Sequence, residues 1–82
     1  MIREILTLVI ERQPASYYII FTKERNRFVF QPTLNSKSNP SFILIVQNDE
    51  IVHDGTPVDD NLFKQAKEKV QEIISNSIFD QL

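Results

Sequence analysis

The 82-residue chain has an ordinary globular composition, with 41% hydrophobic and 24% charged residues, which excludes disorder as its default state. Its formal net charge of -2 argues against a protein whose main role is to neutralise phosphates. The absence of cysteine excludes disulfides, thiolate nucleophiles and zinc ribbons, while one histidine and one glycine exclude multi-histidine metal sites and glycine-rich phosphate loops.

The first expected element is a helix over residues 2–12. Its apolar residues follow the i, i+3, i+4, i+7, i+8 spacing of one helix face. A strand fits less well, because alternation would place Glu4 on the apolar face, although the β-branched content keeps a strand possible. Pro14 is expected to end this helix. The apolar residues of the helix face are Ile2, Ile5, Leu6, Val9 and Ile10.

Four strands are expected next, as two hairpins of an antiparallel sheet. They cover residues 17–22, 27–31, 42–46 and 50–53, which are rich in aromatic and β-branched side chains. Residues 23–26 close the first hairpin, where Asn26 tolerates a left-handed turn, and Asn48 with Asp49 closes the second. A polar loop over residues 32–40 joins the hairpins, and Asp54 with Gly55 ends the fourth strand.

A C-terminal helix completes the expected fold. Asp59 or Asp60 caps its start, and the helix continues to Leu82. We therefore expect one α+β domain over residues 1–82, an antiparallel sheet of about four strands flanked by an N-terminal helix and this longer helix. The apolar face of the C-terminal helix comprises Leu62, Phe63, Ala66, Val70, Ile73, Ile74, Ser77 and Ile78.

Both faces of the central strands are apolar, and this pattern carries the functional prediction. If both helices cover the same face, the other face is an exposed apolar patch, which favours self-association or a small protein partner. In the alternative arrangement each helix covers one face, and the monomer is complete. The candidate interface residues are Tyr18, Ile20, Ile43 and Ile45.

A second candidate surface is the basic tip of the first hairpin. Lys23, Arg25 and Arg27 lie there between aromatic residues, a combination with which some sheets bind single-stranded nucleic acid. Three cations are a small footprint on an acidic protein, and the aromatic residues are equally needed in a core. A nucleic-acid-binding module is therefore the alternative function. The aromatic residues are Phe21, Phe28 and Phe30.

The remaining polar clusters have a structural interpretation. His53 next to Asp54 could form a general base, but neighbouring strand residues point to opposite faces, so a strand end and a turn are favoured. Five acidic residues lie between positions 49 and 60, and we expect a solvated rim. A metal-dependent enzyme built on Asp49, Asp54 and Asp59 is the rival interpretation. We expect no catalytic residue, cofactor or metal.

Two turn segments carry a family resemblance. Residues 20–27 and 49–56 resemble the cyanobacterial element-excision controlling factor family, with a likeness that covers roughly residues 2–65. The chain departs from that family at Glu50, where the family has a glycine. The family also carries a longer C-terminal portion with a Gly-Phe-His-Pro type segment, whereas this chain continues its helix to Leu82. The resemblance implies a small α+β accessory protein linked to DNA-element excision or to a nuclease-like partner, without catalysis of its own.

No targeting or membrane signal is recognised in the sequence. The first thirteen residues contain four charges, and no apolar run approaches the ~20 residues that span a bilayer. We expect a cytoplasmic protein, which suits a chain without cysteine. The sequence thus predicts a non-enzymatic accessory or interaction module that forms a homodimer or binds a small protein partner.

Overall fold

The computed structural model of the protein describes residues 1–36 and 38–80, without the side chains of residues 76–80. It confirms the α+β class, with five strands in place of about four. The elements are β1 (Ile2–Ile10), β2 (Gln13–Phe21), β3 (Arg27–Pro32), the 3-10 helix η1 (Leu34–Ser36), β4 (Phe42–Gln47), β5 (Glu50–His53) and α1 (Asp60–Asp80).

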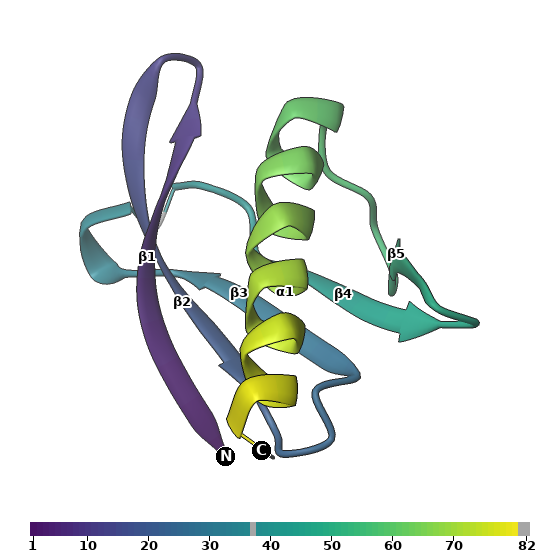
Figure 1. Cartoon of the computed structure of the whole chain (residues 1–82). Coiled ribbons are helices and arrows are strands. Elements are labelled where there is room, and N and C mark those ends of the chain that lie inside the picture. Colours follow the sequence, from purple (N-terminus) through teal and green to yellow (C-terminus); the bar gives the residue numbers. More distant parts are fainter. Residues whose placement is uncertain (37, 81–82) are drawn as a thin grey trace.

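The five strands form one antiparallel sheet in the order β1-β2-β3-β4-β5, so every strand pairs with its neighbour in the sequence. The single long helix α1 runs across one face of this sheet (Figure 1). Strands β1 and β5 are consequently the two edges of the sheet.

The predicted N-terminal helix is wrong, because residues 2–10 form strand β1. Alternation places Ile2, Leu6 and Leu8 on the side of α1, and Glu4 lies on that same side with an exposed side chain. A charge at a sheet edge can reach water, so Glu4 does not exclude a strand. Pro14 does not break β2, because it faces Val9 at a position where it donates no hydrogen bond to β1.

Two hairpins close through two-residue turns with left-handed backbone. Glu11 and Arg12 have φ values of 50° and 69°, and Asn48 and Asp49 have values of 53° and 65°. Positive φ at both central residues is the signature of the type I′ turn, whose twist matches that of the flanking strands. In the β2–β3 connection the left-handed residue is Arg25 (φ 51°) and not Asn26.

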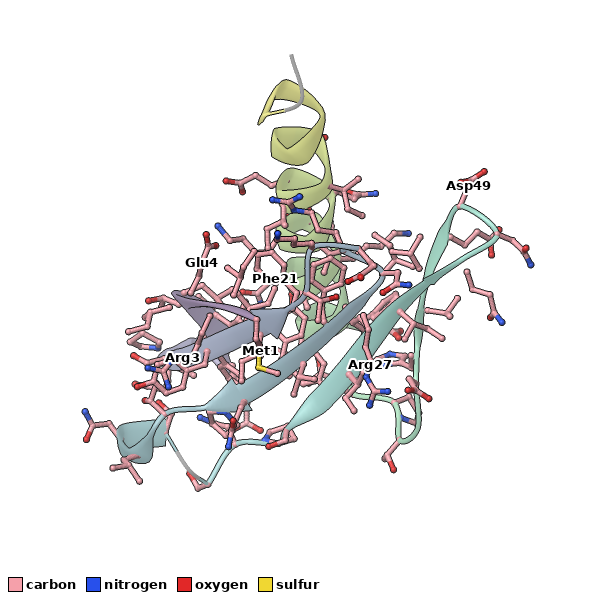
Figure 2. The ribbon with its side chains drawn as sticks, turned by 90° about the horizontal axis from the view of Figure 1, so that it is seen from below. Met1, Arg3, Glu4, Phe21, Arg27 and Asp49 are labelled. Carbon is pink, nitrogen blue, oxygen red and sulfur yellow. The ribbon has the colours of Figure 1, made fainter. Side chains whose placement is uncertain are left out.

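The core lies between the sheet and α1. Its sheet side is rich in aromatic residues: the rings of Phe30 and Phe42 stack at a centroid distance of 4.7 Å, and Tyr17 packs against Phe42 at 5.9 Å. Figure 2 shows Phe21 between the sheet and the helix. The buried residues are Leu8, Ala15, Tyr17, Ile19, Phe21, Phe28, Phe30, Phe42 and Leu44 from the strands, and Leu62, Ala66, Val70 and Ile73 from α1.

Helix α1 begins as the sequence predicts. Asp59 is the capping residue, because its Oδ1 accepts a hydrogen bond of 2.8 Å from the Leu62 backbone N–H. The predicted apolar face is confirmed over the described residues, with Phe63 and Ile74 half-buried at its margins. The predicted positions Ser77 and Ile78 have side chains outside the described part, and Leu82 lies beyond it.

The connection between β3 and β4 is fixed to the sheet by three hydrogen bonds. The Tyr17 hydroxyl donates to the Pro40 carbonyl oxygen over 2.7 Å, and the Ser16 N–H donates to the Ser36 Oγ over 3.0 Å. The Thr33 N–H donates to the Ser16 carbonyl oxygen over 3.0 Å. Burial raises the pKa of the Tyr17 phenol above its ordinary value, because the phenolate would lose contact with water.

Candidate interaction surface

The face of the sheet opposite α1 is the main candidate surface. Strand register brings apolar side chains together there in adjacent rows: Ile20 pairs with Val29, and Val29 pairs with Ile43. Helix α1 lies on the other side of the sheet, and η1 borders this face only at one end, where Leu34 and Asn35 line a hollow with Tyr18 (Figure 2). We call it the helix-free face, and its apolar residues are Ile5, Val9, Pro14, Tyr18, Ile20, Val29, Ile43, Ile45 and Val52.

The margins of the helix-free face carry two arginines. The Arg3 guanidinium lies 4.7 Å from the centroid of the Tyr18 ring, a cation–π contact at the β1 edge. Arg27, at the start of β3, forms an ion pair of 3.8 Å with Asp54. Both arginines extend from the side of the sheet opposite α1 (Figure 2). The centre of the face is therefore apolar and its charges lie at the rim.

All four interface residues that the sequence analysis names lie on this one face, and their side chains are half-buried. Sequence reasoning missed the other apolar residues of this face, which are Ile5, Val9, Pro14, Val29 and Val52. Ile5 is 68% exposed at the edge of the sheet, and its assignment to a helix concealed its place on this face. If residues 2–10 are read as a strand, every second residue faces the same side. Arg3, Ile5 and Thr7 then share one face, and Leu6 and Leu8 share the other.

The three basic residues of the nucleic-acid hypothesis do not converge. Arg25 lies 5.9 Å from the centroid of the Phe21 ring, which belongs to the covered face, whereas Arg27 lies on the helix-free face beside Asp54. Lys23 is exposed in the β2–β3 connection. The aromatic residues of that hypothesis are at most 4% exposed, so they are not available to stack on bases; they are Phe21, Phe28 and Phe30.

His53 and Asp54 are separated as the strand-end interpretation predicts. His53 is the last residue of β5, and its ring packs on Phe63 of α1 at a centroid distance of 4.4 Å. Asp54 contacts Arg27 instead. Gly55 follows with φ 98°, a conformation that L side chains rarely adopt, and it completes the predicted turn.

The acidic residues between positions 49 and 60 serve different parts of the fold. Asp49 forms the β4–β5 turn, Asp54 pairs with Arg27, and Asp59 caps α1. Within residues 1–36 and 38–80, no group of three acidic or histidine side chains could hold a metal ion. A shallow hollow between the β4–β5 hairpin and α1 mixes aliphatic with oppositely charged residues, including Glu50 and Lys67.

Comparison with known proteins adds no assignment. No family model matches the sequence, and neither a curated protein nor a solved structure is significantly similar to it. The resemblance to excision-controlling factors therefore stays a prediction. Across the described residues, no helix is both long enough and apolar enough to cross a membrane.

Proposed function

We propose that this protein is a non-enzymatic interaction module that self-associates through its helix-free face. The single observation that carries the proposal is that nine apolar side chains gather on a sheet face that helix α1 leaves uncovered. Soluble monomers rarely leave such a contiguous patch exposed. Burial at ~25 cal/mol/Å² makes even a few hundred Å² of this surface worth several kcal/mol.

The dimensions of the face suit a second copy of the chain. Five strands ~4.8 Å apart and four to nine residues long form a face of roughly 500 Å² in projection. A standard interface buries about 800 Å² per partner, which is about a seventh of the 5909 Å² surface of this protein. Two such sheets pack face to face about 10 Å apart, with their strands within about 30° of each other.

The charge pattern supports the same partner. Arg3 stacks on Tyr18 and Arg27 pairs with Asp54, so both cations have a favourable contact within their own chain. Because these pairs lie at the rim, two copies can join their apolar centres without burying the arginines. The resemblance to excision-controlling factors adds an accessory role, and the lack of cysteine suits the cytoplasm.

The concentration dependence of the molecular mass tests this proposal. Light scattering across a dilution series should show a dimer that dissociates on dilution, and Ile43→Asp should shift the chain to a monomer. The matched control Gln71→Asp changes an exposed residue of α1 and should leave the dimer intact. Thermal melting checks that each variant is folded. A wild-type chain that stays monomeric at millimolar concentration would contradict the proposal.

A titration with a labelled single-stranded oligonucleotide separates the alternative function. The proposed interaction module should show no binding at low salt. Binding that weakens steeply with salt and is lost in Arg25→Glu would instead support the nucleic-acid module.

A further inference from the structure

The outer edge of β1 carries backbone groups whose direction is fixed by one contact. The Val9 N–H donates to Gln65 Oε1 and the Val9 carbonyl accepts from Gln65 Nε2, both over 2.8 Å. Gln65 belongs to α1, so these Val9 groups point away from β2. In an extended strand, alternate residues direct their backbone groups to the same side. The N–H and C=O groups of Arg3, Ile5 and Thr7 therefore also point outward.

These outward groups form an open edge. Among the described residues, none donates or accepts a hydrogen bond at the outward backbone of Arg3, Ile5 or Thr7. Natural sheets protect such edges with short strands, prolines or lysines. β1 is nine residues long, and Ile5 at its middle is 68% exposed, whereas the opposite edge strand β5 has four residues. Gln65 closes the edge at Val9 alone.

We propose that a second copy of the chain adds its β1 antiparallel to this edge, with Ile5 opposite Ile5 of the second copy. Three residues of each strand then exchange backbone hydrogen bonds: Arg3 with Thr7, Ile5 with Ile5, and Thr7 with Arg3. The two sheets become one sheet of ten strands, and the two helix-free faces become continuous.

The sequence of β1 selects this register. Outward groups must oppose outward groups, so registers differ in steps of two residues. Shifting the pair toward the N-terminus sets Arg3 against Arg3, or Glu4 against Glu4, and like charges directly opposite are unfavourable. Shifting it the other way sets Arg3 against Val9, whose backbone is occupied by Gln65. The register centred on Ile5 has neither conflict.

This inference goes beyond the proposed function, because the β1 edge and the helix-free face are different surfaces. The cysteine-free chain permits a direct test by disulfide cross-linking. In Ile5→Cys the two Cα atoms would be about 5.5 Å apart, within the range that a disulfide spans. Mild oxidation should then yield at least about tenfold more linked dimer than Asp49→Cys, a control at the distant β4–β5 turn (Figure 2).

A mixed experiment tests the register. Arg3→Cys mixed with Thr7→Cys should give linked heterodimer, whereas Arg3→Cys alone should not, because its two copies would lie about 14 Å apart along the strands. Ile5→Pro removes an N–H that β2 does not use and should weaken association, while Ile5→Ala should retain it. If Ile5→Pro fails to fold, the cross-linking still decides.

The outcomes separate this inference from the proposed function. Failure of Ile5→Cys to cross-link, with a dimer that Ile43→Asp dissociates, overturns the edge pairing and leaves the face association standing. Cross-linking of Ile5→Cys in a dimer that Ile43→Asp does not affect supports the edge pairing and contradicts the face association. A monomer without cross-links contradicts both.

Discussion

In the middle of β2, β3 and β4 (residues 17–21, 28–30 and 42–46) both faces of the sheet are entirely apolar, yet they differ in the kind of side chain they carry. The covered face holds Phe28, Phe30 and Phe42, each at most 4% exposed. The helix-free face holds mainly β-branched residues such as Ile20 and Ile43, which stay half-buried by their neighbours alone. Large aromatic rings bury more area per residue and need a helix above them, whereas short branched chains pack sideways on the pleated surface. Apolar composition therefore does not identify the covered face, but side-chain size does.

Truncating neighbouring residues of β3 should give the largest contrast between the faces. Phe30→Ala should lower the free energy of unfolding by about 3–5 kcal/mol, because it removes a fully buried ring that stacks on Phe42. Val29→Ala, on the helix-free face, should cost only about 1 kcal/mol in the dilute monomer. Urea denaturation at low protein concentration measures both. If both variants lost the same free energy of unfolding, the two faces would be equally buried and the proposed difference between them would be wrong.

The cap of α1 affects the covered face alone. Asp59→Ala should destabilise the fold by about 1 kcal/mol, because the Leu62 N–H loses its acceptor. Asp60→Ala is the matched control and should cost less, since Asp60 is the first helical residue and contributes mainly through its charge. Thermal unfolding compares the two. A larger loss of stability in Asp60→Ala than in Asp59→Ala would show that Asp59 is not the residue that caps α1.

Two adjacent tyrosines allow a test by pH. Burial raises the pKa of Tyr17 above 10.0, so its contribution to stability is complete below pH 10 and is lost as the pH rises through the raised pKa. The free energy of unfolding should therefore fall above pH 10, and Tyr17→Phe should flatten that fall. At neutral pH this variant should cost about 1 kcal/mol for the hydrogen bond to Pro40.

Tyr18→Phe, on the helix-free face, is the matched control for this pH series. It should keep the alkaline fall of the wild type, since Tyr17 is retained. An alkaline profile of Tyr17→Phe that is identical to the wild type would show that another group causes the loss.

The rim of the helix-free face should give the smallest effect. Asp54→Asn removes the partner of Arg27, and both side chains are about half exposed, at 45% and 57%. An exposed ion pair of this kind is worth about 0.5 kcal/mol or less and is screened by salt. Unfolding measured at low and high salt should show a difference that vanishes at high salt. A decrease of more than about 1 kcal/mol in the free energy of unfolding would contradict this, because the Arg27–Asp54 pair would then contribute more than an exposed ion pair does.

The sequence predicted the last two thirds of the fold better than the first third. The strands from residue 27 to 53, the turn at Asn48 and Asp49 and the cap at Asp59 were predictable because each has local chemistry that favours its conformation. The β1–β2 hairpin was not, because Glu11 and Arg12 are not residues that usually adopt left-handed turns. Without a turn signal, the apolar spacing before Pro14 fitted a helix.

The helix-free face was predictable in part. Alternation within residues 17–21 and 42–46 identified both apolar faces, and the four residues named from it lie on one side as a set. The alternation alone does not show which side α1 covers; that side differs from the other by its large aromatic rings, such as Phe28 and Phe30. The open edge of β1 could not be predicted from local patterns, since an edge is defined only by the order of all strands in the sheet.

The order of elements along the chain has a consequence for synthesis. All strand pairings join consecutive segments, so the sheet can form as each hairpin leaves the ribosome. The helix that covers its aromatic face is the last described element, and residues 54–80 must be added after β5 to complete it. At ~5–20 residues per second, synthesis of this stretch takes about 1–5 s, during which that face is bare. A chaperone that binds aromatic surfaces would therefore meet this protein at one defined stage of translation, between the completion of β5 and the arrival of α1.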